Sequence, residues 1–214
     1  MIHGDLLQHH RPNPSRERMV EQSRKMLKVT MGPDLLARKG AMVAHDGFIE
    51  FGHEGAGLSR YLKQWGSGEG VPLMRCTGQG DLYLGAHGND IVSFYLDNDE
   101  ITVNSPNIVG FDAHLQWDIK AMKGVGMLAG GLFSIAIAGS GWVALASDGP
   151  PIVLRTDEAP TFVDTDAIVA WSRGLNVSLH RSASLKSLVG RGSGEAFQLA
   201  FAGAGYVVVQ PSER

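Results

Sequence analysis

The stretch GMLAGGLFSIAIAGSGWVALAS, residues 126–147, decides the fold, because it lies in a segment long enough and uncharged enough to cross a bilayer. No charge occurs from Gly124 to Ser147, yet this segment holds six glycines, which are poor helix formers. Between Phe133 and Leu145 apolar residues recur at every second position, which is the spacing of a strand. The stretch therefore predicts two strands around a bend, with both faces largely buried, and argues against a membrane helix.

The same alternation around a Gly-x-Gly occurs three times, at 133–145, at 197–209 and, more weakly, at 72–84. Glycine allows a sharp bend where a side chain would clash. The other two copies contain or adjoin charges at Arg75, Asp81 and Glu195, which a bilayer disfavours. The three copies thus describe one kind of strand pair and not a membrane span.

The repetition extends to the segments before each copy. Residues 100–111 match 160–171 at an offset of 60, and 34–45 fit the same frame at an offset of 66. We therefore predict an all-β chain with three internal repeats, each a β-sandwich or double-stranded β-helix-like unit, packed in a pseudo-threefold arrangement. The predicted bounds are a polar N-terminal arm at 1–25 with a short helix after Ser15, one β domain at 26–210 with repeats at about 26–90, 91–151 and 152–210, and a tail at 211–214.

Composition narrows the class of protein. Lys and Arg number 19 against 22 Asp and Glu, a net charge of −3, which disfavours a strongly electrostatic nucleic-acid binder. Cys76 is the one cysteine, which excludes a disulfide framework and a four-cysteine zinc site. The N-terminal segment 1–20 lacks the apolar core of a signal peptide. We expect a cytoplasmic protein without a transmembrane segment, for which peripheral membrane contact stays open.

Several motifs together resemble a known family. They are the Gly-x-Gly strand pairs, Ala-Met-Val-Ala at 41–44, the Gly-Ser-Gly-Glu runs near 67 and 192, and the C-terminal Gly-Tyr-Val-Val-Val-Gln. In their three-repeat order they resemble the altered inheritance of mitochondria protein 24 family over about residues 26–210. The resemblance implies a fold similar to the tryptophan RNA-binding attenuation protein, with three β-sandwich subdomains per chain. It implies no catalytic residues, and the acidic residues Glu17 and Glu21 interrupt the basic arm that mitochondrial import would use.

The histidines do not form a recognisable metal motif. A cupin-like site needs two histidines one residue apart on a strand, and no His-x-His occurs among the eight histidines. His53-Glu54 is the nearest fragment, while His45 aligns with Phe111 and Trp171, so packing explains it better. Cys76 aligns with apolar residues and is expected to be buried. We predict no catalytic residue, no metal and no cofactor.

One threefold feature could bind a ligand. The connections between strands contain Lys63, Lys123 and Lys186, each directly after an apolar residue and shortly before a Gly-x-Gly copy. If a threefold axis relates the repeats, these ammonium groups converge on one rim and could hold an anion, a phosphate or a lipid headgroup. Solvated lysines on exposed connections are the alternative interpretation.

The leading functional hypothesis is a non-enzymatic β scaffold that acts by self-assembly or by binding a protein partner. It rests on a well-specified fold without an acid–base, metal or nucleophile constellation. Open sheet edges or the Gly-rich connections would supply the contact surface. The alternative is a protein that binds a small molecule, an anion or a nucleic acid, and a cupin-like metal enzyme is a further alternative.

Overall fold

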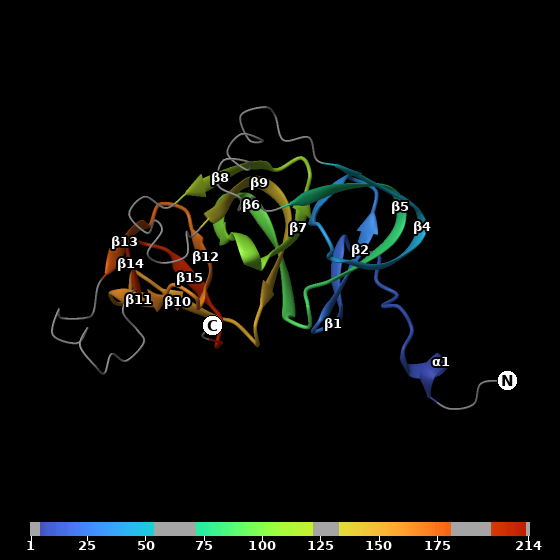
Figure 1. Ribbon diagram of the computed structural model, residues 1–214, viewed down its shortest axis with the longest axis horizontal. Coiled ribbons are helices and arrows are strands. Elements are labelled where there is room, and N and C mark those ends of the chain that lie inside the picture. Colours follow the sequence, from blue (N-terminus) through green and yellow to red (C-terminus); the bar gives the residue numbers. More distant parts are fainter. Residues whose placement is uncertain (1–4, 54–71, 122–132, 181–197, 213–214) are drawn as a thin grey trace.

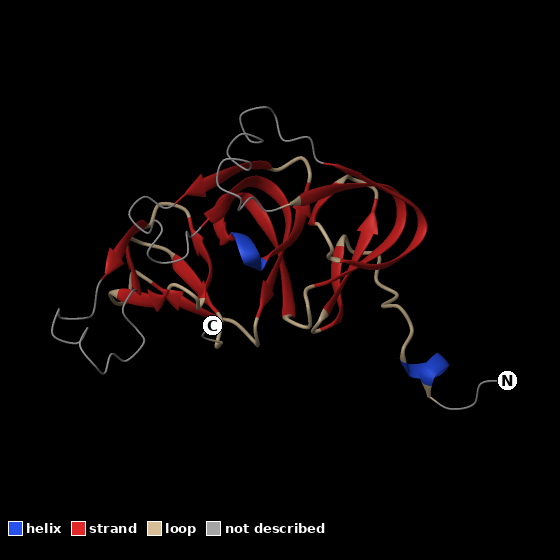
Figure 2. Cartoon of the chain, viewed as in Figure 1, coloured by secondary structure: helices blue, strands red, loops and turns tan. Residues whose placement is uncertain are grey.

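The structure is a computed structural model that describes residues 5–53, 72–121, 133–180 and 198–212. Within these ranges nearly all regular structure is β (Figures 1 and 2), apart from the short helix α1 (Leu6–His9) and the short 3-10 turn η1 (Ser105–Asn107). The strands are β1 (Met19–Ser23), β2 (Met26–Met31), β3 (Leu35–Arg38), β4 (Met42–His53), β5 (Leu73–Gly85), β6 (Asp90–Asn104), β7 (Ile108–Asp112), β8 (Gln116–Ala121), β9 (Phe133–Ser147), β10 (Ile152–Arg155), β11 (Thr161–Asp164), β12 (Ile168–Ser172), β13 (Asn176–His180), β14 (Gln198–Ala202) and β15 (Tyr206–Val209). The all-β prediction is confirmed.

The strand that decided the fold is β9, whose residues 133–147 are extended throughout. It pairs with β6 along both of its halves, with β8 beside its first half and β7 beside its second. The prediction of two strands around a bend is therefore wrong in one respect: the bend at Gly139, where φ is 126°, lies inside one strand. Because of this bend, the two halves of one strand pair with different neighbours, β8 and β7, beside their shared partner β6.

Strand β5 is built in the same way. It pairs with β4 along most of its length, with β3 beside its first half and β2 beside its second. Gly78 and Gly80 have φ of 113° and 135°, and a Cβ on either would overlap the backbone of β4. These two positions need glycine for both conformation and space.

In the last third of the chain the corresponding strand is divided. β14 pairs with β11 and β13 in a three-stranded sheet, while β15 pairs with β10 and β12 in the twelve-stranded sheet. Residues 203–205 separate the two strands, and Gly203 has a φ of 118°. Here the prediction of two strands around a bend is confirmed.

The buried apolar residues form three clusters. The strands that supply most of their residues follow one another along the long axis (Figure 1). Leu27 and Cys76 represent the first cluster, Phe111 and Ile135 the second, and Phe201 the third. Two junctions join them through the backbone, since β3 pairs with β7 and β6 pairs with β12. The core is thus distributed along an elongated molecule and is not concentrated at one centre.

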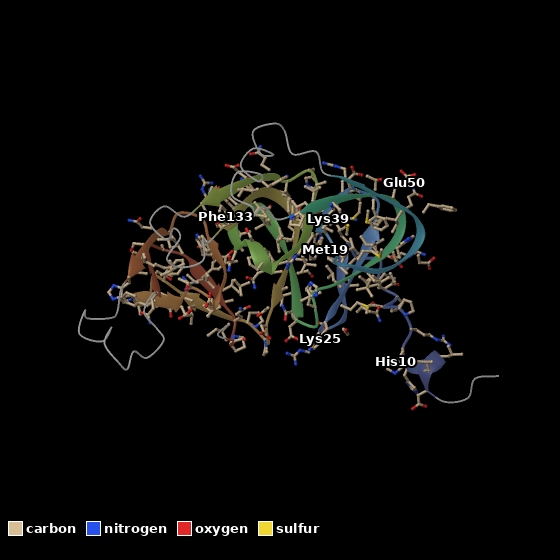
Figure 3. The ribbon with its side chains drawn as sticks, in the orientation of Figure 1. His10, Met19, Lys25, Lys39, Glu50 and Phe133 are labelled. Atoms are coloured by element: carbon tan, nitrogen blue, oxygen red, sulfur yellow. The ribbon has the colours of Figure 1, made fainter. Side chains whose placement is uncertain are left out.

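The N-terminal segment differs from the prediction of a polar arm with a helix after Ser15. The helix is α1, which begins earlier, at Leu6, and projects away from the strands together with the labelled His10 (Figure 3). Ser15 lies outside any helix, and Met19–Ser23 form β1, which pairs with β2. The Met19 side chain belongs to the first cluster, so burial of an apolar residue draws this segment onto the sheet.

Candidate interaction surface

The most exposed apolar surface lies on β4. Among the described strands β4 pairs only with β5, so its outer edge carries unpaired backbone groups. Residues 42–48 are exposed on both faces, including Val43 and Phe48, and Phe48 is 93% exposed. In Figure 3 the labelled Glu50 marks this end of the molecule. A long exposed strand edge with apolar side chains is a template for pairing with another strand.

A pair of aromatic rings lies on the same strand. The rings of His45 and Phe51 meet edge to face, with centroids 5.6 Å apart. The sequence interpretation that packing explains His45 is only partly right, since the ring packs on Phe51 yet remains exposed. Phe111 and Trp117 form a similar edge-to-face contact at 6.1 Å, but there Phe111 is fully buried. The His45–Phe51 pair on β4 is therefore exposed to solvent, whereas the Phe111–Trp117 contact involves a fully buried ring.

A second open edge lies at the opposite end of the molecule (Figure 1). Among the described strands β11 pairs only with β14. Thr161 and Val163 are buried, whereas Phe162 between them is 48% exposed and contacts the His180 ring at a centroid distance of 5.0 Å. This alternation leaves one aromatic side chain beside an unpaired edge.

One cavity, of about 560 Å³, lies between the N-terminal segment and the bend of β4 and β5. Arg16 and Lys28 both line it. The Lys28 side chain is 5% exposed, and its Nζ forms an ion pair with Asp81 at 3.2 Å. The same Nζ donates to the carbonyl oxygens of Asn13 and Ser15 at 2.7 and 2.9 Å. The three oxygens hold the ammonium group, so its role here is to anchor the N-terminal segment.

A second open cavity, of about 520 Å³, lies beside β8 and the first half of β9. Its lining includes Trp117, Glu100 and Lys120, and the last two form an ion pair at 3.2 Å. The two charges compensate each other. Neither they nor the tryptophan supply a nucleophile beside a base.

In the ranges that the structure describes, no group of three His, Cys, Asp or Glu side chains is placed to hold a metal ion, and the absence of a metal site stays a prediction. His114 Nε2 lies 2.8 Å from the carbonyl oxygen of Ser140. Cys76 is buried as expected, and burial raises the pKa of its thiol to about 11, with Arg18 opposing the shift. A thiol protonated at neutral pH is a poor nucleophile.

The predicted rim of Lys63, Lys123 and Lys186 lies outside the described residues, as do the Gly-rich runs at 66–70 and 190–194. The rim therefore stays a prediction. Sequence reasoning missed the two exposed edges, because Met42, Val43 and Phe48 look like ordinary core residues of a strand. The available signal was that His45 stands where the other two predicted repeats carry Phe111 and Trp171.

The fold and the surface define an all-β protein whose open strand edges include β4 and β11. No described helix has the length and apolarity that a membrane span requires. The family model described as mitochondrial biogenesis AIM24 matches residues 18–212, and the chain belongs to this family. That match confirms the family resemblance, and its start at residue 18 agrees with the inclusion of β1 in the sheet.

Two similar proteins come from Streptococcus pyogenes. An uncharacterized protein of a serotype M6 strain is 24% identical over 193 residues, which cover 84% of this chain and 77% of that protein. The crystal structure of protein SPYM3_0169 has a TM-score of 0.72 at 22% identity, covering 91% of this chain and 92% of the other. At this identity the structural likeness establishes the fold alone.

Proposed function

We propose that this protein is a non-enzymatic β scaffold that acts by self-assembly or by binding a protein partner. The observation that carries the proposal is that two of the open edges among the described strands, β4 and β11, lie at opposite ends of the molecule. Both bear exposed aromatic side chains, Phe48 on one and Phe162 on the other. Edge strands with apolar side chains are costly to leave open, so a scaffold that uses them for contact gains from their exposure.

We also infer that the chain consists of three repeats, near 26–90, 91–151 and 152–210. Support comes from the order in which strands pair with each bent strand. In each third of the chain, four consecutive segments precede the bent strand and pair with it. The first and third segments pair with its second half, and the second and fourth segments pair with its first half. In the middle third these segments are the two halves of β6, then β7 and β8. In the last third they are β10 to β13.

The first third follows the same order, with β2, β3 and the two halves of β4. A pseudo-threefold arrangement like that of the attenuation protein would bring the first and last repeats together. Among the described strands, none of the first repeat pairs with one of the last. The threefold arrangement is therefore a proposal that depends on how these two ends are covered.

Native mass spectrometry of gently purified, untagged protein tests the scaffold proposal. A defined oligomer, or a complex with a co-purifying protein, without other added mass is the expected result. An oligomer held by strand edges and apolar side chains should persist at high salt, because salt screens ion pairs and leaves apolar contacts intact. A monomer carrying a small molecule, an anion or RNA that is lost on denaturation would replace the proposal with the binding alternative.

We infer in addition that the protein works without catalytic residues, metal or cofactor, and that its compartment is the cytoplasm. A single buried thiol suits a reducing compartment. Elemental analysis of untagged protein and fractionation of cells by compartment test these two points. A stoichiometric metal would reopen the cupin-like alternative, and recovery outside the cytoplasm would refute the second point.

A further inference from the structure

The two junctions inside the chain share one register. At the first, Leu36 of β3 lies opposite Phe111 of β7, flanked by the pairs 35 with 112 and 37 with 110. At the second, Thr102 of β6 lies opposite Trp171 of β12, flanked by 101 with 172 and 103 with 170. Positions 36 and 102 correspond in the repeat frame, and so do 111 and 171. Each junction thus joins the second segment of one repeat to the third segment of the next.

The irregularities of the strands follow the same frame. The register of β4, β7 and β12 with their bent strands shifts between residues 42 and 44, 108 and 110, and 168 and 170. The three shifts fall at matching positions of the repeat frame, so the third segments correspond residue by residue. The strand of the first repeat that matches β7 and β12 is therefore the first half of β4.

At each end of the chain, this correspondence leaves one segment that has no partner of the kind found at the two internal junctions. The third segment of the first repeat, Ala44 to Asp46, has no preceding repeat to pair with. The second segment of the last repeat, Thr161 to Val163, has no following repeat. Both are open edges among the described strands, and they lie at opposite ends of the molecule.

We propose that these two edges pair with each other between copies of this chain, in the register of the two internal junctions. The β4 edge of one copy lies antiparallel to the β11 edge of the next, with Ala44 opposite Val163, His45 opposite Phe162, and Asp46 opposite Thr161. The inference rests on the proposed scaffold function and names a second copy as the partner.

The side chains at the two edges support a second copy of the chain as the partner. At the first internal junction Leu36 and Phe111 lie opposite each other in the second cluster, and Phe111 also contacts Trp117. His45 and Phe51 occupy the positions of Phe111 and Trp117, while Phe162 occupies that of Leu36. In the proposed pair Phe162 covers the exposed His45–Phe51 rings, as Leu36 covers its own pair.

Close backbone approach also requires a small residue at one position. A Cβ on Gly110 would come within 2.9 Å of the Leu36 carbonyl oxygen and 3.4 Å of the Ala37 Cα. The matching residue at the second junction is Ala170, which is fully buried. Ala44 is the third small residue of the set, and it is exposed in the single chain. Its size suits a backbone neighbour that the single chain does not provide.

Contact between two different edges is heterologous, so each added copy presents a fresh edge. Such contacts close into a ring when the rotation between copies closes, and extend as a filament when it does not. A symmetrical dimer built from two β4 edges would differ, because both copies would use the same edge and no β4 edge would remain for a further copy.

Cysteine cross-linking tests the register. Cys76 is buried and protonated, so it does not compete. His45→Cys and Phe162→Cys are prepared as separate chains, mixed and treated with a mild oxidant or a short bis-maleimide. Opposite residues of an antiparallel pair have Cβ atoms about 4.5–5.5 Å apart, near the span of a disulfide. We expect a covalent dimer containing one chain of each kind.

Two controls use the same chemistry elsewhere. Asp164→Cys, two positions further along β11, should link to His45→Cys more slowly. Val153→Cys, on the exposed strand β10 at a position that is 62% exposed, should give no dimer above background. In the unmodified background, Ala44→Lys should raise the dissociation constant of the oligomer at least tenfold, and Val153→Lys should leave it unchanged.

The outcomes separate this inference from the scaffold proposal. An oligomer that resists Ala44→Lys and gives no 45–162 link overturns the pairing but leaves self-assembly standing. A chain that stays monomeric at every concentration, without a cross-link, overturns the pairing and also self-assembly. A double variant, His45→Cys with Phe162→Cys, that links within one monomer shows that the ends meet in the same chain, which overturns pairing between copies.

Discussion

Replacing Asp112 by alanine should lower the free energy of unfolding more than removing an exposed charge does. Its carboxylate forms an ion pair with Arg18, Oδ1 to Nη2 at 2.9 Å, and the side chains are 6% and 12% exposed. Its other oxygen accepts the backbone N–H of Trp142 at 2.9 Å. The same guanidinium donates to the carbonyl oxygens of Thr30 and Pro33 at 2.6 and 2.8 Å. The pair therefore ties the N-terminal segment to the middle of the chain.

The magnitude follows from this burial. Asp112→Ala leaves the Arg18 charge without its counter-ion and the Trp142 N–H without its acceptor. Removing one partner of a buried ion pair costs about 3–5 kcal/mol. For a chain of this size that corresponds to a fall of roughly 6–20 °C in the melting temperature. Asp112→Asn should cost less, because the amide oxygen still accepts the Trp142 N–H.

Thermal and urea unfolding followed by circular dichroism measure the effect. Asp157→Ala is the matched control, since Asp157 pairs with Arg155 at 2.7 Å on the surface, and it should melt with the parent chain. The double variant Arg18→Met with Asp112→Leu should regain part of the loss, because it leaves no unpaired charge. If Asp112→Ala costs less than about 1 kcal/mol, the range of exposed ion pairs, the reasoning is refuted.

Three further predictions concern backbone space, a buried amide and the thiol. Gly80→Ala should prevent stable folding, because its Cβ would overlap the backbone of β4, whereas Gly32→Ala, with open space around it, should melt like the parent chain. Gln210→Ala should cost about 1–3 kcal/mol in urea unfolding, since the buried Asn107 amide loses an acceptor at 3.1 Å, and a fall below about 0.5 kcal/mol would contradict this. Because burial raises the pKa of Cys76 from 9.0 to about 11, the unfolded chain loses this proton first, so stability should fall from pH 9 to 11. Cys76→Ala should lack that part of the fall, and rapid reaction of the folded thiol with Ellman's reagent at pH 8 would argue against the burial.

Sequence periodicity predicted the strands well because alternation of buried and exposed side chains is a local property. It marked β9, β14 and β15 and the correspondence between the segments that precede them. It could not show that β9 stays one strand through Gly139, because that depends on β6 pairing along both halves. Local pattern carries no information about which neighbour a strand will meet.

The same limit applies to the candidate surface. The alignment of His45 with Phe111 predicts packing, yet Phe111 lies beside β3 whereas His45, among the described strands, lies beside β5 alone. The pairing of β1 with β2 was missed because a short segment with two adjacent polar side chains, Glu21 and Gln22, looks like part of an arm. Contacts that join distant segments required the structure.

The sharing of cores between neighbouring segments affects how the protein can fold while it is being made. Ala144 and Ala146 of β9 belong to the first cluster, and Val208 of β15 belongs to the second. A chain emerging from the ribosome therefore cannot complete its first core when β5 appears, but only once β9 has followed. Its second core waits for residues close to the C-terminus. Synthesis from the N-terminus thus delivers incomplete cores in succession, and β15 closes a core that began with Leu36 of β3.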